Sequence, residues 1–367
     1  MQFYISREAL LKPLQLATGV VERRNTLPVL SNVLLSLHND ELSITGTDLE
    51  VELIGRVPVQ SGSKAGEVTV PARKLMDICK SLSEDAILEF SIDDGKAVIK
   101  AGRSRFTLAT LPGSDFPSTD NEPHTFELTI PVKDLKMLLD ACSFAMAQQD
   151  VRYYLNGMLF EVTGDHLRVV ATDGHRLAMQ TLPMQNALSQ ALQIIVPRKG
   201  ATELSRLLTD SSGDVTVIFG TNHIRARMKD FMFTSKLIDG KFPDYNRVLP
   251  KGGDKTVIGD RVLLKQAFNR ASILSNEKYR GVKMLLAPGE MRVLANNPEQ
   301  EEAEETVSVS YSGELLEIGF NVGYLVDVLT VLGSEQVRIS LADSNSSALL
   351  EGVSAEDAVY VVMPMRL

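Results

Sequence analysis

The chain has 367 residues, of which 44% are apolar and 23% charged, and this length exceeds what one ordinary core needs. The near-average composition excludes a disordered or collagen-like protein, and the net charge of −9 excludes a surface that is positive all over. Cys79 and Cys142 are isolated, which excludes a disulfide framework and a CxxC metal site. Without a signal pattern or an apolar run near the roughly 18 residues of a membrane helix, we expect a cytoplasmic protein.

In chain order, the predicted elements form one series that occurs three times. Each series begins with a helix of apolar periodicity, at 7–20, 133–147 and 260–274. An alternating strand follows, at 42–50, 167–176 and 291–300. A shorter helix comes next, at 72–83, 198–208 and 322–332. This order indicates three copies of one unit.

The spacing of the copies supports a triplication. Asp48, Asp173 and Asn297 are 125 and 124 residues apart, and the pair Phe116-Pro117 recurs 126 residues later. Turn-rich stretches at 112–124 and 250–255 separate the copies. We therefore predict domains at 1–124, 125–252 and 253–367.

Turn and helix signals predict the fold class. Pro71 and Pro197 come directly before the second helices, where a missing N–H costs least, and Pro13 lies inside the first helix near its start. Hairpin turns are predicted at 94–95 and 163–165. Helices and strands that alternate irregularly are typical of an α+β fold, with helices on one face of antiparallel sheets.

The distribution of charge points to a polyanionic partner. The six predicted helices sum to a formal charge of +6, so the remaining residues sum to −15, since the whole chain carries −9. Positive charge gathered on helices could present one basic surface to nucleic acid, although solvated helix faces with scattered lysines are the alternative.

Two strands of opposite charge suggest self-association. Residues 102–109 alternate Arg103 and Arg105 with Ser104, Phe106 and Leu108, and residues 298–309 hold a run of glutamates. Unlike charges would steer head-to-tail pairing of two chains, whereas a solvated acidic loop is the alternative for the second stretch.

Catalytic motifs are absent from the sequence. It has no Walker loop, GxGxxG or GxSxG, and its five histidines lack metal spacing. The cluster Asp173-Gly174-His175-Arg176 resembles an active site, but its sister copies lack the histidine. Two alternatives remain open: an enzyme acting on nucleic acid with Asp173 and His175 as acid and base, and a monomeric DNA-binding module.

Five segments carry a resemblance to a known family. They are QDVRYYLNGMLFEV (149–162), TDGHRLA (172–178), FTSKLIDGKFPDY (233–245), NNPEQEEAEE (296–305) and YVVMPMRL (360–367). Together they resemble the bacterial sliding clamps, the beta subunits of the replicative DNA polymerase III holoenzyme. The resemblance implies three clamp domains per chain and a ring-shaped head-to-tail homodimer, with twelve helices around duplex DNA.

The same resemblance implies the function and partners. A sliding clamp is not an enzyme, needs no cofactor or metal, and acts as a processivity factor. Its partners would be double-stranded DNA, a second copy of itself, polymerases, the clamp-loader ATPase and repair proteins that carry a short binding motif.

The resemblance also assigns residues to three surfaces. Positions expected near DNA are Arg24, Arg73, Gln149, Tyr153, Tyr154, Arg198 and Lys199. Positions expected in a partner-peptide pocket are Leu155, Thr172, Gly174, His175, Arg176, Leu177, Pro243, Val248, Tyr324, Val361, Val362, Met363, Pro364, Met365 and Arg366. The dimer interface is expected to use Lys74, Arg103, Arg105, Phe106, Leu108, Ile273, Leu274, Glu299, Glu301, Glu302 and Glu305.

The repeat predicts where the pocket lies. Met363 is 126 residues after Leu237, so the tail should form the closing strand of the third unit, close to Pro243 and Val248. An apolar cleft with Arg176 and Arg366 at its rim would then lie at a domain junction. Asn345 departs from the family pattern, because an apolar wall residue is expected there.

Overall fold

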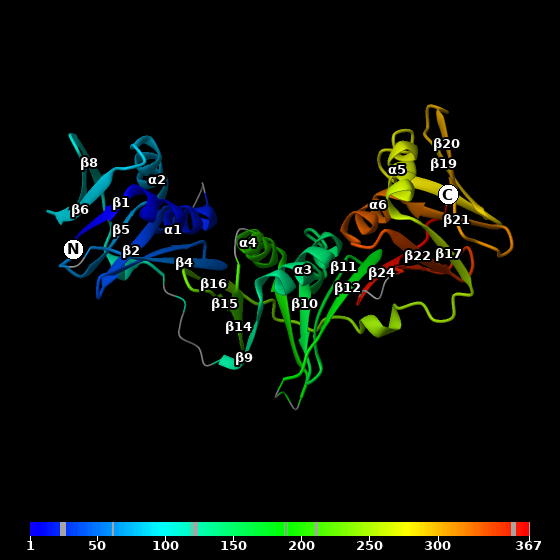
Figure 1. Cartoon of the computed structure of the whole chain (residues 1–367), viewed down its shortest axis with the longest axis horizontal. Helices are drawn as coiled ribbons and strands as arrows, with labels where there is room; N and C mark the ends of the chain where they lie inside the picture. The colour runs from blue at the N-terminus through cyan, green and yellow to red at the C-terminus, as the bar shows by residue number, and fades with distance from the viewer. Residues whose placement is uncertain are drawn as a thin grey trace. The chain divides into compact units, whose positions relative to one another are not determined.

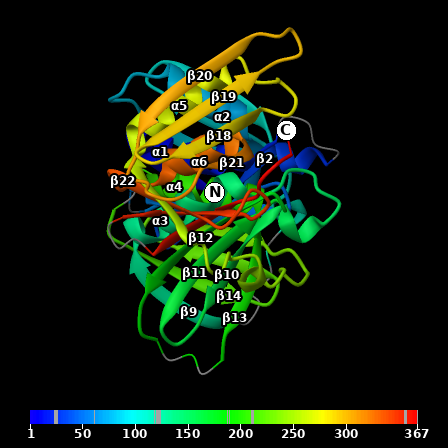
Figure 2. The ribbon, with the colours of Figure 1, turned by 90° about the vertical axis from the view of Figure 1, so that its right-hand side faces the viewer.

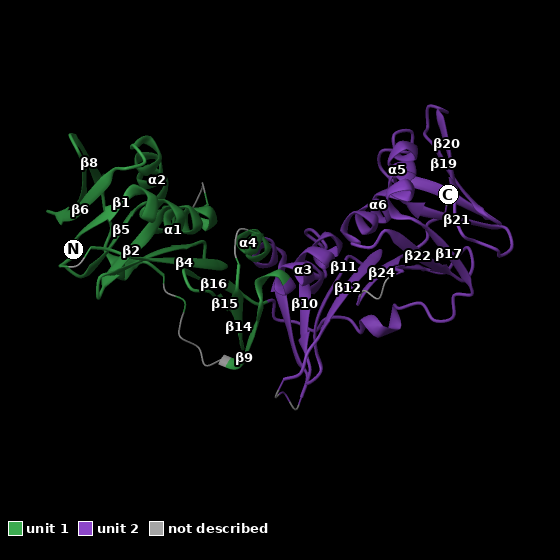
Figure 3. Ribbon diagram, viewed as in Figure 1, with its two compact units in different colours: residues 1–133, 203–237 green, residues 134–202, 238–367 purple. Residues whose placement is uncertain are grey.

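The structure is a computed structural model that describes residues 1–22, 27–60, 62–117, 119, 124–186, 188, 190–209, 212–353 and 357–366. The chain divides into two compact units, residues 1–133 with 203–237 and residues 134–202 with 238–367 (Figure 3). Each unit combines one four-stranded and one eight-stranded antiparallel sheet. Figure 1 labels the elements along the chain.

Unit 1 contains the N-terminal elements. Its four-stranded sheet has the order β1 (Gln2–Ser6), β6 (Ile87–Asp93), β7 (Lys96–Ala101) and β8 (Ser104–Ala109). Its eight-stranded sheet has the order β5 (Gly66–Pro71), β2 (Asn32–His38), β3 (Glu41–Thr47), β4 (Val51–Pro58), β16 (Phe231–Lys236), β15 (His223–Arg227), β14 (Asp214–Gly220) and β9 (His124–Pro131). Helices α1 (Arg7–Val20) and α2 (Ala72–Ser81) share one apolar core with strands of both sheets.

Unit 2 follows the same plan. Its eight-stranded sheet has the order β13 (Leu192–Pro197), β10 (Gly157–Val162), β11 (His166–Thr172), β12 (Arg176–Pro183), β24 (Ala358–Val362), β23 (Ala348–Gly352), β22 (Gln336–Leu341) and β17 (Lys255–Asp260). Its four-stranded sheet has the order β20 (Glu302–Ser308), β19 (Glu290–Asn296), β18 (Gly281–Ala287) and β21 (Leu316–Asn321). Helices α5 (Arg261–Ser272) and α6 (Val322–Val331) lie behind these four strands, with β20 outermost (Figure 2).

The predicted helices are all present. Two of them, α3 (Val132–Cys142) and α4 (Arg198–Thr209), begin in one unit and end in the other. Short 3-10 turns complete the chain: η1 (Pro28–Ser31), η2 (Gly113–Asp115), η3 (Ser143–Ala145), η4 (Tyr153–Leu155) and η5 (Tyr245–Arg247). The α+β class, with helices against antiparallel sheets, is confirmed.

Both eight-stranded sheets join strands of neighbouring sequence repeats. In unit 1 the junction is β4 with β16, and in unit 2 it is β12 with β24, both antiparallel. Each repeat thus contributes a half-sheet that is completed by the next repeat. The two four-stranded sheets are half-sheets without such a continuation, so β8 and β20 are edge strands within the described chain.

Local chemistry explains the element boundaries. The side chains of Ser6 and Asp260 cap α1 and α5 by accepting backbone N–H bonds. Gly46 lets α1 approach β3 closely, because a Cβ there would lie 2.0 Å from the Ala17 carbonyl oxygen. The hairpin turn at Asp94-Gly95 is confirmed, with both residues at positive φ.

One prediction about α1 is wrong. Pro13 is the seventh residue of the fourteen-residue helix and lies at its middle rather than near its start. It is buried, and Gly55 leaves room for its ring, because a Cβ at Gly55 would lie 2.6 Å from Pro13 Cβ. Packing in the core therefore compensates for the helix hydrogen bond that proline removes.

Both cysteines are core residues. Cys79 and Cys142 are fully buried and unpaired, and burial raises the pKa of the Cys79 thiol to about 11. Burial also raises the pKa of Cys142. Neither thiol is thus set up as a nucleophile. In the described parts of the chain, no helix is long and apolar enough to cross a membrane.

Candidate functional site: a cleft beside the C-terminal tail

An apolar cluster covers one face of the eight-stranded sheet in unit 2. Its buried members come from five strands and from the segment after β16: Leu159, Val170, Leu177, Met179, Ile195, Phe242, Tyr245 and Val361. Tyr154, Leu249 and Leu349 pack against it and remain partly exposed. The cluster therefore brings parts of the second and third repeats together.

The C-terminal tail is anchored to this cluster. Leu177 in β12 is the direct partner of Val361 in β24. Beyond β24, the Met363 N–H donates to the His175 carbonyl oxygen at 2.9 Å, and the Met365 N–H donates to the Gly319 carbonyl oxygen at 2.9 Å. The tail thus runs as the closing strand that the repeat predicts, and its Met363 side chain is 44% exposed beside the 172–176 turn.

Two cavities share Asn345 in their walls, and one of them reaches the tail. One has a volume of about 660 Å³ and is lined by residues that include Val248, Leu249, Leu349 and Asn345. The other, of about 340 Å³, is lined by residues that include Met365, Arg366 and Asn345. Asn345 therefore lies in the wall of both cavities, and it places an amide where an apolar side chain was expected.

The predicted pocket residues fall into three classes of exposure. Four are buried in the core: Leu155, Leu177, Val361 and Val362. Six are exposed and form the accessible surface: Gly174, His175, Pro243, Val248, Met363 and Arg366. The rest are partly buried: Thr172, Arg176, Tyr324, Pro364 and Met365. A ligand in the unaltered cleft would contact the six exposed residues directly, and the four buried residues would lie beneath them.

Hydrogen bonds build the 172–176 turn. The Thr172 hydroxyl donates to the Arg176 carbonyl oxygen at 2.6 Å and accepts from the Gly174 N–H at 3.1 Å. Asp173 Oδ1 accepts the backbone N–H groups of His175 and Arg176 at 2.9 and 3.0 Å. Gly174 has φ of +88°, which favours glycine. Because the Asp173 carboxylate is engaged in this way, it is poorly suited to act as a general base.

Arg176 is an internal connector, and its expected place at the rim of the pocket stays a prediction. Its side chain is only 12% exposed, because it reaches into the body of unit 2. Its guanidinium donates to Asp173 Oδ2 at 3.1 Å, to the Phe144 carbonyl oxygen at 2.7 Å and to Asp327 of α6.

Aromatic rings complete the surroundings of Arg176. Its Cζ lies 4.4 Å from the centre of the Tyr324 ring and 5.1 Å from that of Phe144. Burial and the neighbouring carboxylates raise the pKa of Tyr324, although Arg176 opposes them. The Tyr324 ring also stacks on His175, with centroids 6.5 Å apart. Arg176 thus joins the 172–176 turn to α6.

The residues expected near DNA have varied surroundings. Arg73 is exposed near the start of α2, whereas Arg198, the first residue of α4, is half-buried and donates to the Met146 carbonyl oxygen at 2.9 Å. Tyr153 is 57% exposed, and Tyr154 instead packs against the apolar cluster. The remaining positions are an exposed Gln149 at positive φ, a half-buried Lys199 and Arg24, which lies outside the described residues.

The β8 edge carries the predicted basic residues. Arg103 and Arg105 are exposed, as is Lys74 of α2, and Phe106 is half-buried. Leu108 is only 8% exposed in the single chain, and its contact with a second chain stays a prediction. It shares the strand face that packs on the core of unit 1.

The β20 edge carries the acidic residues. Glu299, Glu301 and Glu302 are exposed, and nearby Ile273 is 76% exposed with Leu274 half-buried. Glu305 is already paired within the chain, because Arg270 Nη2 lies 2.6 Å from its Oε2. If Glu305 pairs with a basic residue of another chain, that residue must share the Glu305 carboxylate with Arg270.

Sequence reasoning missed several residues of the cleft. Tyr245, Phe242 and Leu349 contribute to the cluster or the cavity, and Asp327 holds Arg176. The recurring Phe-Pro pair at 242–243 signalled this segment. Nothing in the local pattern marked Asp327, which is 151 residues from Arg176. Among the described residues, no group of three or more His, Cys, Asp or Glu side chains is arranged to hold a metal ion.

Comparison with known proteins identifies three matching domain families. Residues 1–120, 129–244 and 246–366 match the N-terminal, central and C-terminal domains of the DNA polymerase III beta subunit. The chain is 61% identical to the beta sliding clamp of Pseudomonas aeruginosa and 52% identical to that of Escherichia coli, each over the full length of both chains. A crystal structure of the Pseudomonas aeruginosa clamp bound to griselimycin matches with a TM-score of 0.97 and 61% identity over all of both chains.

We predict that Arg176→Ala lowers the free energy of unfolding by about 2–3 kcal/mol, because it leaves a buried cluster of polar partners unpaired. The value lies at the low end for a buried pair, since the Asp327 side chain is 44% exposed. Urea unfolding monitored by circular dichroism measures the change.

The matched control is Arg247→Ala. Arg247, like Arg176, pairs with an aspartate three residues before it: its Nε lies 3.0 Å from Asp244 Oδ2. The Arg247 side chain, however, is 86% exposed. We expect a loss below about 0.5 kcal/mol there. Equal losses in the two variants would contradict the connector role of Arg176.

Proposed function

The chain belongs to the bacterial sliding clamps, the beta subunits of DNA polymerase III, and from this premise we propose which residues form its three working surfaces. As a sliding clamp it is a processivity factor and not an enzyme. It pairs with a second copy of itself to encircle duplex DNA, and it tethers polymerases and repair proteins through a peptide-binding pocket.

The first surface is the junction between two chains. In the repeat, β20 corresponds to β4 and β12, and β8 corresponds to β16 and β24. Those partners pair antiparallel in the two eight-stranded sheets. We propose that β8 of one chain pairs with β20 of the other in the same way, with Ile273 and Leu274 beside it. The exposed basic and acidic side chains of the two edges support this arrangement.

Two such junctions related by a two-fold axis would close the ring. Phe106 would supply much of the apolar contact, because buried aromatics dominate interface energies. Arg103, Arg105 and Lys74 would face the exposed glutamates.

We predict that the double variant Ile273→Ala, Leu274→Ala shifts the protein toward monomer, because it removes the apolar part of the junction. Sedimentation at low concentration measures the shift. Leu27→Ala is the control, since Leu27 is 50% exposed but is not assigned to the junction. A double variant that sediments as a dimer like the wild type would place the interface elsewhere.

The second surface faces DNA. We propose that Arg24, Arg73, Gln149, Tyr153, Arg198 and Lys199 lie along the duplex, with Tyr154 behind them against the apolar cluster. The exposure of Arg73 and Tyr153 supports the assignment. Contacts from such side chains to phosphates carry no sequence information, which suits a ring that must slide. Retention on circular DNA and loss after linearisation would test this topological hold.

We predict that Arg24→Ala, Arg73→Ala and Arg198→Ala each weaken DNA binding regardless of base sequence. The slope of log K against log salt should flatten by roughly one unit per lost phosphate contact. Salt titrations of fluorescence anisotropy measure the slopes. Lys96→Ala, on the exposed β6–β7 hairpin, should leave the slope unchanged. Arg198→Ala also needs a thermal unfolding check, because Arg198 holds the Met146 carbonyl. Unchanged slopes in all three variants would contradict a basic channel.

The third surface is the cleft beside the C-terminal tail. We propose that it captures a short peptide with one or two bulky apolar residues, and the hydrogen bond from Met363 to His175 is the observation that carries this assignment. This bond holds an exposed methionine beside the 172–176 turn, and methionines suit a surface that serves many partners. Affinity near 1 µM, about −8 kcal/mol, would suit exchange of partners.

We predict that deleting residues 363–367 abolishes peptide binding while the dimer and DNA binding persist, because strand β24 ends at Val362. Isothermal calorimetry with a polymerase-derived peptide measures the loss, and sedimentation checks the dimer. A truncated chain that binds the peptide with wild-type affinity would exclude the tail from the site.

We further propose domain limits of 1–124, 125–252 and 253–367. The packing of Tyr245 against Leu159 and Val170 supports assigning residues up to 245 to the second domain. A cytoplasmic location is proposed as well, supported by the role in replication and by two unpaired, buried thiols.

A further inference from the structure

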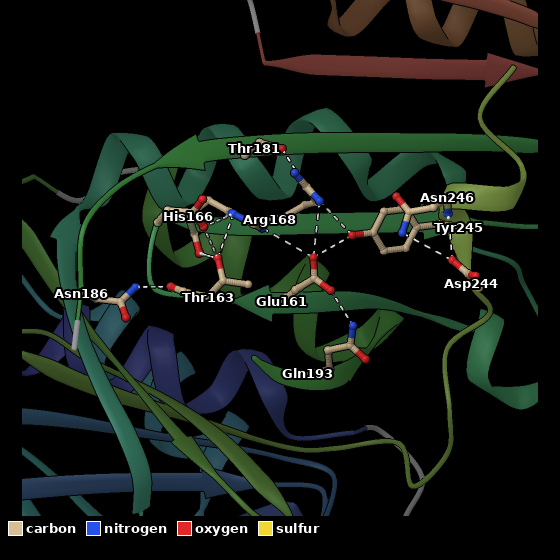
Figure 4. A network of polar contacts seen from close by, with 11 residues as sticks. Glu161, Thr163, His166, Arg168, Thr181, Asn186, Gln193, Asp244, Tyr245 and Asn246 are labelled. Atoms are coloured by element: carbon tan, nitrogen blue, oxygen red, sulfur yellow. Dashed lines mark hydrogen bonds and ion pairs between the residues drawn. The ribbon is translucent and has the colours of Figure 1, made fainter. Parts of the chain in front are cut away.

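A row of polar side chains crosses four neighbouring strands of the eight-stranded sheet in unit 2 (Figure 4). Gln193, Glu161, Arg168 and Thr181 are direct cross-strand partners in this order. The Gln193 amide donates to Glu161, and Arg168 Nε donates to Thr181 Oγ1 at 3.0 Å. Glu161 lies two residues after Leu159, so the row borders the apolar cluster on the same face of the sheet.

Tyr245 joins this polar row to the apolar cluster. Its ring is a buried member of the cluster, only 4% exposed. Its hydroxyl donates to Glu161 Oε1 at 2.7 Å and accepts from Arg168 Nη1 at 2.9 Å. A single side chain from the segment after β16 is thus fixed to two strands of the sheet (Figure 4).

The charges suit this arrangement. Burial would raise the pKa of Glu161, but hydrogen bonds from Tyr245 and Gln193, the nearby His166 and the charge of Arg168 outweigh it and lower that pKa. Burial and the bond to Glu161 raise the pKa of Tyr245. At neutral pH the carboxylate is therefore charged and the phenol protonated, which makes a charge-assisted hydrogen bond of fixed direction.

The position of Tyr245 sets the wall of the cleft. Its carbonyl oxygen accepts the Val248 N–H at 3.0 Å, which closes the η5 turn. Val248 is 43% exposed and lines the cavity of about 660 Å³. Pro243 is exposed on the other side of the turn, next to the buried Phe242. Movement of Tyr245 would thus shift both exposed residues.

We propose that Glu161, Arg168 and Tyr245 are positioning residues of the peptide cleft, which hold η5 so that Val248 and Pro243 stand where a partner's apolar side chains can meet them. The inference rests on the proposed peptide site. It deepens that proposal, because none of the three residues needs to touch the peptide.

The first repeat supports a role beyond folding. The corresponding positions there are Ser36, Ser43 and Thr119, which cannot form this triad. The first repeat nevertheless builds its half of an eight-stranded sheet with the same strand order. The triad therefore accompanies the cleft and is not a requirement of the fold.

The test uses Tyr245→Phe, which removes one hydroxyl and keeps the ring. Its matched control is Tyr311→Phe, because the buried Tyr311 also donates its hydroxyl, at 2.6 Å, to the Glu314 carbonyl oxygen. The probe is a synthetic peptide with two bulky apolar residues and one tryptophan. The chain contains no tryptophan, so the peptide's fluorescence reports binding directly.

Tyr245→Phe should weaken binding of this peptide by about three- to tenfold, the usual effect of one hydrogen bond. Tyr311→Phe should change it less than about twofold. Hydrogen exchange of the Val248 amide should accelerate in Tyr245→Phe only. The effect should shrink in a Val248→Ala background, because Tyr245 acts through Val248. Glu161→Gln keeps an acceptor for the phenol and should retain part of the affinity that Glu161→Ala loses.

The outcomes separate the two proposals. If Val248→Ala and Met363→Ala weaken binding while Tyr245→Phe binds as the wild type does, the positioning role is overturned and the peptide site stands. If neither Val248→Ala nor Met363→Ala affects the peptide, the site itself is wrong. If the Tyr245→Phe and Val248→Ala effects simply add, Tyr245 does not act through Val248. Should Tyr245→Phe fold poorly, the comparison of Glu161→Gln with Glu161→Ala decides the question.

Discussion

The cleft depends on the buried guanidinium of Arg176. This group contacts the turn that carries His175, the helix that carries Tyr324 and Asp327, and the carbonyl of Phe144 after α3. A charge at this depth is tolerable only because carboxylates, a carbonyl and two aromatic rings surround it. Those partners belong to two different sequence repeats, so one side chain fixes the relative position of the elements between which the tail lies. The nearly buried side chain of Arg176 therefore determines how the exposed residues of the cleft are arranged.

Sequence reasoning predicted the fold well because the fold is periodic. The recurring strand and helix patterns predicted the helices that the described residues form, and the spacing of Met363 from Leu237 predicted the course of the tail. The patterns that predict each element are local, since each depends on residues within one turn or one strand, and the triplication extends them along the chain. The family resemblance then supplied surfaces that periodicity alone could not, and the matched domains support the same family.

The contacts that shape the cleft are not local, and this is where prediction from sequence failed. Tyr245 meets Glu161 from 84 residues away, and Arg176 meets Asp327 from 151 residues away. No pattern in one sequence pairs such positions. Arg176 and Leu108, which the family resemblance assigns to two surfaces, are only 12% and 8% exposed in the single chain, and no local pattern predicts this burial. Tyr153 and Tyr154 are adjacent in sequence, yet one is exposed and the other packs inward.

The edge strands β8 and β20 also bear on how a lone chain avoids aggregation. Exposed strand edges are the usual starting points of aggregation, because their backbone groups can bond to any strand. Here one edge carries arginines and the other carries glutamates, so two β8 edges repel each other and two β20 edges repel each other. Only unlike edges can meet, which by itself would permit an endless filament. Once two chains share one junction, their remaining edges are held at high effective concentration, so closure outcompetes the addition of a third chain. The charge pattern and the tether together favour a finite assembly over a fibre.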